Sequence, residues 1–256
     1  MIKALSSNMI NDTKIKDMIR QIKFAIEHRN IISYFQPIIN NQTKKIEKYE
    51  SLVRLVNTDN EVLLPECFLA ISKSSNNYCD ITKQVLENSF LMLQENSNIS
   101  ISINLSMSDI ENEDIRSIII NFLDEYSGFG KRIIFELLED EKITNFKTIS
   151  RFIYSIKKRE VRIAIDDFGT GYSNFERIFK LSPDIIKIDG SLIGGLESSS
   201  YSRDLVESLV HFSQKQGIKT VGEWVENEST YKILRNIGVD YSQGNYFGKP
   251  DLISFG

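Results

Sequence analysis

The chain has 256 residues, of which 41% are hydrophobic, and a formal net charge of −4. This composition supports a folded core and excludes a disordered chain. The acidic balance, without a long basic stripe, argues against a partner that is a long nucleic acid. Two cysteines without a CxxC spacing and two histidines exclude a zinc or His-rich metal site.

The N-terminus lacks the apolar core of a signal peptide, and no apolar run approaches the ~18 residues of a membrane span. We therefore expect a cytoplasmic protein with no membrane contact in this chain. An amphipathic helix is predicted over 12–29, within an N-terminal segment (1–30) that either forms part of the following domain or leads into it.

After this helix, short apolar strands alternate with helical stretches. The predicted strands are 31–38, 46–54, 99–105, 131–138, 161–167, 184–188, 218–224 and 241–247. The predicted helices are 65–73, 80–95, 113–126, 145–159, 174–181, 201–216 and 228–237. Eight strands with intervening helices indicate one (β/α)₈ barrel over 31–256. Only residues 40–45 join the first two strands, which is too short for a parallel crossover. We therefore predict a TIM-like barrel with one antiparallel strand.

Polar residues lie toward the carboxyl ends of nearly all of these strands, although strands are generally depleted in such residues. They are Glu50, Asn104, Glu136, Asp166, Asp167, Lys187, Glu223 and Gln243. In a barrel these positions converge on the C-terminal mouth, where active sites of this fold lie.

The run from Ile163 to Gly171 is the most informative stretch, because an apolar strand ends in two adjacent carboxylates and enters a Gly-rich turn. Burying carboxylates is costly unless they are paired or bind metal. An ordinary loop in which Asp caps a turn is the alternative. The polar strand ends favour a cation site, because carboxylate oxygens suit Mg²⁺ or Mn²⁺.

Five carboxylates in one mouth require cations, and two divalent ions ~3.5–4 Å apart would clamp a phosphodiester. Asp166 and Asp167 suit a bridging role. Glu50, Asn104 and Glu136 would complete one ion, and Glu223 would serve the second directly or through water.

Three further charged residues have both a chemical and a structural interpretation. Lys187 could orient or help deprotonate water or stabilise phosphoryl charge, and a salt bridge to Asp189 or Glu223 is compatible with that role. Arg54 could contact a phosphate or be a solvated strand-end charge. Glu139 could hold the Gly-rich loop by accepting backbone N–H bonds.

Eight segments in order resemble the EAL domain family of phosphodiesterases that hydrolyse cyclic di-GMP. They are YFQPI (34–38), ESLVR (50–54), INLS (103–106), FELLE (135–139), DDFGTGYSN (166–174), IKIDGS (186–191), GEWVE (222–226) and QGNYFGKP (243–250). The resemblance implies a TIM-like barrel with one antiparallel strand and Mg²⁺- or Mn²⁺-dependent opening of cyclic di-GMP to linear 5′-pGpG.

The resemblance also assigns roles. The metal-site residues would be Glu50, Asn104, Glu136, Asp166, Asp167 and Glu223. The catalytic residues would be Glu50, Lys187, Glu223 and Gln243, with Gln243 positioning water or the site. The substrate-binding residues would be Gln36, Arg54, Asp189 and Pro250, and Glu139 would anchor the DDFGTG loop. A homodimer and a sensor domain in a longer native protein are further implications.

The chain departs from the family pattern at a few positions. Ser51 replaces the usual Ala and should fit, while Leu138 replaces Thr and removes a hydroxyl near the loop anchor. Gly222 and Trp224 replace Ala and Gly around Glu223, and we expect Trp224 to point away from Glu223 and pack outside the barrel.

Two other functions use the same residues. A non-catalytic cyclic di-GMP receptor acting through a partner is the main alternative to the phosphodiesterase. Carboxylates with a lysine at a barrel mouth also suit Mg²⁺-assisted proton abstraction, as in the enolase group, although the order of the segments argues against this.

Overall fold

The computed structural model describes residues 2–75, 77–138, 145–169 and 180–253, with side chains from residue 13 onward. The chain forms two compact units. One comprises 1–34 with 53–91, and the other comprises 35–52 with 92–256.

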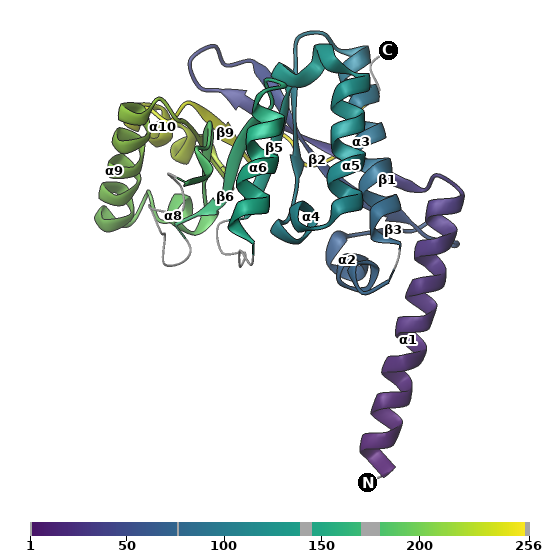
Figure 1. Cartoon of the computed structure of the whole chain (residues 1–256). Coiled ribbons are helices and arrows are strands. Elements are labelled where there is room, and N and C mark those ends of the chain that lie inside the picture. Colours follow the sequence, from purple (N-terminus) through teal and green to yellow (C-terminus); the bar gives the residue numbers. More distant parts are fainter. Residues whose placement is uncertain (1, 76, 139–144, 170–179, 254–256) are drawn as a thin grey trace. The chain divides into compact units, whose positions relative to one another are not determined.

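The strands form one sheet that closes into a barrel, in which a single strand, β1, is reversed. They are β1 (Ile31–Asn40), β2 (Ile46–Val56), β3 (Val62–Leu63), β4 (Ser100–Asn104), β5 (Ile133–Leu138), β6 (Arg162–Phe168), β7 (Ile185–Ile188), β8 (Lys219–Gly222) and β9 (Tyr241–Gln243). Their order is β1-β9-β8-β7-β6-β5-β4-β2-β3, and a β1–β2 pairing closes the barrel. Figure 1 labels several of these strands and the helices along the chain. β1 is antiparallel to β9, whereas the pairs from β2–β4 through β8–β9 are parallel. The predicted TIM-like barrel with one antiparallel strand is thus confirmed; the short β3, antiparallel to β2, was not predicted.

Along the chain, the first of the described helices precedes the first strand, and the others lie between later strands. They are α1 (Ile2–Glu27), α2 (Pro65–Lys73), α3 (Tyr78–Glu95), α4 (Met107–Glu111), α5 (Glu113–Glu125), the 3₁₀ turn η1 (Ser127–Arg132), α6 (Phe146–Lys157), α8 (Gly190–Gly194), α9 (Ser200–Gln216) and α10 (Glu228–Ile237). The predictions for 65–73 and 228–237 match α2 and α10, while most of the helix predicted over 174–181 lies outside the described residues. Among these helices, none has the length and apolarity needed to traverse a lipid bilayer.

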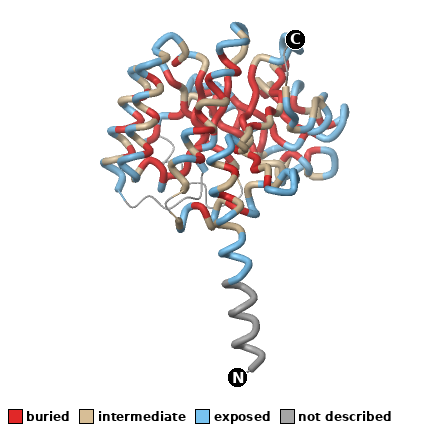
Figure 2. The backbone as a smooth tube through the Cα atoms, turned by 90° about the vertical axis from the view of Figure 1, so that its right-hand side faces the viewer, coloured by how far each residue is buried: buried red, intermediate tan, exposed pale blue. Residues whose placement is uncertain are grey.

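An apolar layer lies in the barrel of the larger unit. It comprises Ile38, Ile134, Ala164, Ile185 and Val221. Because side chains two residues apart on a strand share a face, the next inward positions on β5, β6 and β7 are Glu136, Asp166 and Lys187. The fold therefore stacks a polar layer on an apolar one. Figure 2 marks the buried stretches of the chain in red.

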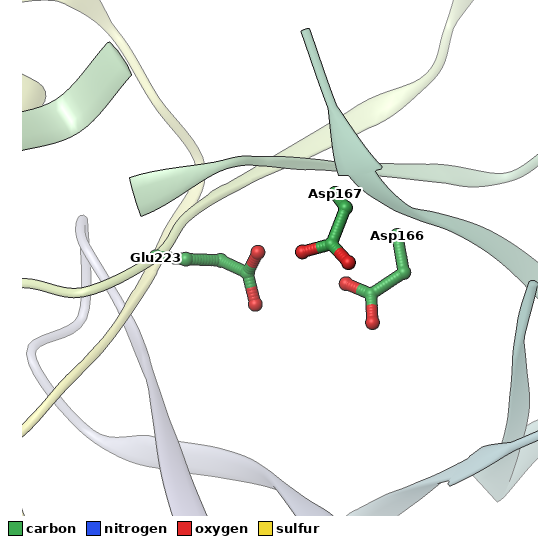
Figure 3. A group of neighbouring side chains, drawn as sticks. All are labelled: Asp166, Asp167 and Glu223. Carbon is green, nitrogen blue, oxygen red and sulfur yellow. The ribbon is translucent and has the colours of Figure 1, made fainter. Parts of the chain in front are cut away.

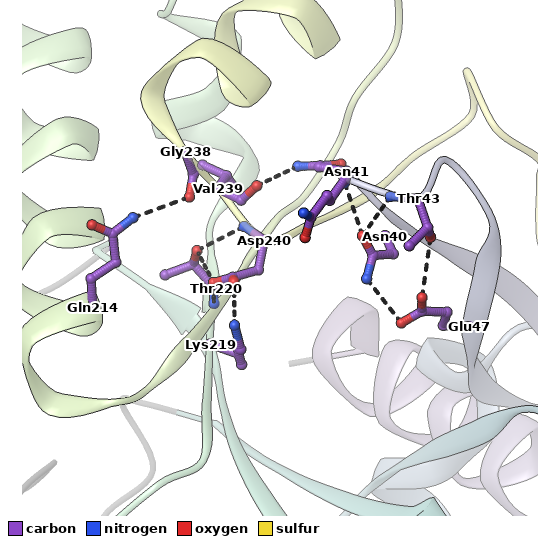
Figure 4. Close-up of polar contacts among 11 residues, drawn as sticks. Asn40, Asn41, Thr43, Glu47, Gln214, Lys219, Thr220, Gly238, Val239 and Asp240 are labelled. Atoms are coloured by element: carbon purple, nitrogen blue, oxygen red, sulfur yellow. Dashed lines mark hydrogen bonds and ion pairs between the residues drawn. The ribbon is translucent and has the colours of Figure 1, made fainter.

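Polar side chains fix the junction of β8, β9 and the β1–β2 turn (Figure 4). The Asp240 carboxylate accepts hydrogen bonds from the Thr220 backbone N–H (3.0 Å) and hydroxyl (3.2 Å). Asn41 Nδ2 donates to the Val239 carbonyl over 2.8 Å. Farther along β9, Gln243 stands opposite Ile38 of β1. These contacts set the register that carries Gln243 to the mouth.

The smaller unit has its own apolar core. The second half of α1 supplies Ile22 and Ala25, which pack with Leu55, Phe68 and Ile81. Hydrogen bonds also tie α3 to this core, since Gln84 Nε2 donates to the Ile26 carbonyl over 2.9 Å. The α1 helix is thus attached to its unit by apolar contacts and a backbone-directed hydrogen bond.

Candidate active site

A buried lysine lies at the centre of the polar layer. Lys187 on β7 is 1% exposed, and its Nζ lies 2.8 Å from carboxylate oxygens of Glu136 and of Asp166. The same Nζ lies 2.9 Å from Glu223 Oε1 and 3.4 Å from Glu50 Oε2. The predicted convergence of strand ends is therefore present. Of the two structural partners considered for Lys187, Glu223 forms the salt bridge.

The carboxylates carry more negative charge than this lysine can neutralise. Burial raises the pKa of Glu136 well above its ordinary value, despite the opposing charge of Lys187. Burial also raises the pKa of Glu223, to about 8. Burial pushes the pKa of Glu50 upward, but Lys187 and hydrogen bonds from Gln243 and Asn104 outweigh it, so this pKa is lowered. The surplus negative charge needs protons or a cation.

A distortion of β6 brings its two adjacent aspartates toward one side. The register with β7 shifts between Ile165 and Phe168, and Asp167 has a left-handed backbone with φ +54°. Neighbouring strand residues normally face opposite ways, and a bulge re-aims one of them. In Figure 3 both carboxylates point toward Glu223, and one oxygen from each of the three residues lies within 4.8 Å of the others.

A chain of amides holds Glu50 in place. Gln243 Nε2 donates to Glu50 Oε2 (2.7 Å), and Asn104 Nδ2 donates to Glu50 Oε1 (2.8 Å). The Gln243 amide also donates to Gln36 Oε1 over 3.1 Å. Gln36 in turn donates from its Nε2 to the Gly248 carbonyl over 3.2 Å. The segment after β9 is thereby linked to the carboxylate cluster.

A pocket of about 370 Å³ opens onto this cluster. Its lining includes Gln36, Glu50, Leu52, Asp166, Lys187, Glu223, Trp224, Glu226, Gln243 and Pro250. Gln36 and Pro250 were predicted to contact substrate, and both line the pocket. The expected packing of Trp224 outside the barrel was wrong, because this residue lines the same pocket as Glu223 and is 71% exposed. Its backbone is left-handed, at φ +52°, so the alternation of a regular strand does not extend to it.

The remaining predicted residues lie in different settings. Asp189 caps α8 by accepting from the Ser191 N–H over 2.8 Å. Arg54 belongs to the smaller unit, where its guanidinium carbon lies 5.2 Å from the Tyr34 ring centroid. Glu139 lies outside the described residues, and Leu138, which ends β5, is 37% exposed.

The donor set fits a hard divalent cation. Asp166, Asp167 and Glu223 present carboxylate oxygens, the ligand type preferred by Mg²⁺ and Mn²⁺. Burial, followed by the charge of Asp166, raises the pKa of Asp167. A cation would relieve this repulsion, so the charge imbalance and the ligand chemistry agree.

A closed α/β barrel with a carboxylate cluster and a lysine at its C-terminal mouth defines the class as a TIM-type barrel with an acidic centre. The EAL domain model matches residues 19–250, and the chain belongs to the EAL domain family. It is 29% identical over 237 residues to the cyclic di-GMP phosphodiesterase PdeF of Escherichia coli, covering 91% of this chain and 32% of that protein. The chain thus spans about a third of the length of this curated relative.

Solved structures agree with this assignment. An EAL domain protein from Listeria monocytogenes has a TM-score of 0.82 and 28% identity, covering 90% of this chain and 92% of that one. The FimX EAL domain from Pseudomonas aeruginosa, solved bound to c-di-GMP, has a TM-score of 0.84 at 24% identity, covering 92% and 96% of the two chains. The latter likeness concerns the fold alone.

Proposed function

We propose that this chain is a metal-dependent phosphodiesterase that hydrolyses cyclic di-GMP to linear 5′-pGpG. The observation that supports this most directly is the cluster of four carboxylates around Lys187, beside a pocket, in a member of the EAL family. The name of the relative PdeF supplies the substrate class. In the reaction, water adds to one phosphorus, the bond to the 3′-oxygen breaks, and that oxygen takes up a proton.

The residues proposed to hold two Mg²⁺ or Mn²⁺ ions are the acidic and amide side chains of the mouth. Asp166, Asp167 and Glu223 form the group already close enough to share a cation, and Glu50, Asn104 and Glu136 would complete the set. When bound, such ions supply positive charge for the phosphoryl oxygens and make water a better nucleophile.

The chain's own groups would orient the reactants. Lys187 is proposed to orient the attacking water and to offset charge on the phosphoryl oxygens. Despite its burial, the four carboxylates keep its pKa raised, so it remains an ammonium and cannot take a proton from water. Gln243 keeps Glu50 in a fixed orientation through its 2.7 Å hydrogen bond. Gln36, Asp189 and Pro250 are proposed to bind the nucleotide, and Arg54 a phosphate. Glu139 remains the predicted anchor of the loop after β6.

The experiment is chromatographic detection of 5′-pGpG with Mg²⁺, Mn²⁺ or EDTA, beside the Glu50→Ala variant. We expect product only with metal, and its near-complete loss in the variant, because a buried ligand is removed. A binding measurement in EDTA accompanies it. Nucleotide binding without turnover under any metal would contradict the enzyme and support the receptor alternative, and reverting Leu138 to Thr would then be the next step. Near-native turnover by Glu50→Ala would refute the role of Glu50.

We further propose that the native protein carries a sensor domain, since this chain spans about a third of its relative PdeF. A homodimer and a cytoplasmic location remain predictions from the sequence.

A further inference from the structure

Trp224 is an unusual residue in the candidate pocket. It is the chain's single tryptophan, it directly follows Glu223, and 71% of it is exposed. Large aromatic side chains normally contribute to stability by being buried. Here the indole lines the same pocket as Gln36 and Lys187 instead.

The backbone at this position is also unfavourable for a residue with a side chain. Trp224 has φ +52°, a region that favours glycine. Hydrogen bonds on both sides hold this conformation, from the Glu223 N–H to the Ile188 carbonyl (3.2 Å) and from the Val225 N–H to the Gln243 carbonyl (3.0 Å). Glycine would satisfy these bonds without strain, so stability does not account for a tryptophan here.

A glycine of the neighbouring helix sets the position of the indole. A Cβ at Gly190, the first residue of α8, would lie 2.3 Å from Trp224 Cγ and 2.6 Å from its Cδ1. The side chain therefore lies directly against the Gly190 backbone. This contact restricts the ring while most of its surface stays exposed beside Glu223.

We propose that the exposed surface of the Trp224 indole stacks on a purine base of the substrate, which makes it a substrate-binding residue. The inference rests on the function proposed above. A flat, immobilised aromatic ring is a stacking platform for a nucleobase. The carboxylates of the pocket cannot provide such a surface, whereas the indole lies next to them in the chain. Strain at residue 224 is thus retained for substrate binding.

The single tryptophan makes the contact directly measurable. Cyclic di-GMP is titrated into the protein in EDTA while tryptophan fluorescence and, separately, binding heat are recorded. We expect saturable quenching with the same dissociation constant as calorimetry. Trp224→Gly should weaken binding about tenfold, as the loss of one stacked base predicts, with a melting temperature no lower than that of the parent. Trp224→Phe should stay within about threefold of the parent.

Tyr201→Ala is the matched control, because Tyr201 is an exposed aromatic (72%) on α9 that does not line this pocket, and its loss should leave the affinity unchanged. Unchanged fluorescence and unchanged affinity of Trp224→Gly, in a protein that binds and hydrolyses cyclic di-GMP, would overturn the role of Trp224 alone. A parent protein that neither binds nor hydrolyses the nucleotide would overturn the proposed function and this inference together.

Discussion

At the scale of single residues, the candidate site is a problem of charge balance. Lys187 is the shared partner of four carboxylates, and their charges raise its pKa well above the ordinary value although burial opposes this. The ammonium is therefore retained in the folded protein. A buried charge whose partner is removed is strongly destabilising, so this lysine has a structural role besides the chemical role proposed for it.

Lys187→Ala should separate these two roles. We expect cyclic di-GMP binding to change little, while the rate of the chemical step falls by at least about 100-fold, the usual effect of losing one group that stabilises transition-state charge. Single-turnover kinetics at saturating substrate would measure this, with a melting curve in Mg²⁺ to confirm folding. Lys219→Ala is the control, since Lys219 forms an exposed ion pair with Asp240 at 2.7 Å. A loss confined to affinity would make Lys187 a binding residue instead.

At the scale of secondary-structure elements, most strands and helices were predictable because their apolar periodicity is local. The hairpin of β1 and β2 was predictable from its short connection alone. The left-handed backbone at Asp167 and Trp224 was not predictable from the sequence. Residues with a side chain rarely adopt such φ values, and here the surrounding strands impose them. Strand alternation therefore does not give the side-chain direction at these two positions in the mouth, where the backbone departs from a regular strand. Asp167 was nevertheless predicted to act beside Asp166.

Strand β2 contains a buried lysine that destabilises the fold. Lys48 on β2 is 3% exposed, its Nζ lies 2.6 Å from the Tyr241 ring centroid, and within the described part of the chain it has no hydrogen-bond acceptor. Burial, followed by the charge of Arg162, lowers its pKa to about 6. The unfolded chain keeps this proton up to about pH 10.5, so the site destabilises the fold at pH 7 and does so less as pH rises toward that value.

Lys48→Met should therefore raise the melting temperature at pH 7. We expect a gain of ~3 °C, which corresponds to about 1 kcal/mol for a domain of this size. The gain should shrink at pH 9.5, where the unfolded chain holds the proton less firmly. Differential scanning calorimetry at both pH values tests this, and a variant less stable than the parent at pH 7 would show that the Lys48–Tyr241 contact is net stabilising.

At the scale of the whole molecule, the fold brings several carboxylates together at the mouth of the barrel, where they repel one another. In the metal-free fold, the Glu223 carboxyl keeps a proton up to about pH 8, whereas an unfolded glutamate loses it near pH 4.5. Its contribution to stability therefore falls as pH rises through this window. A cation that binds only the folded chain would counteract this loss.

We expect the increase in melting temperature produced by Mg²⁺ to be larger at pH 8 than at pH 6.5, because metal binding must displace the proton. The apparent affinity should rise by up to about tenfold per pH unit for each proton released. Thermal shift titrations at the two pH values measure this. Glu223→Gln should flatten the difference, and a parent protein with equal stabilisation at both values would contradict proton-linked binding.

The sequence alone determined the barrel, its reversed strand and the polar residues that gather at its mouth, because these follow from local periodicity, connection length and strand direction. Only the tertiary structure decided how those residues meet. Contacts between segments distant in the chain decide three features: the sharing of Lys187 among strands, the bulge that aims Asp166 and Asp167 toward Glu223, and the place of Trp224 in the pocket lining. A pattern within one strand carries no information about such contacts, since the neighbouring strands impose them.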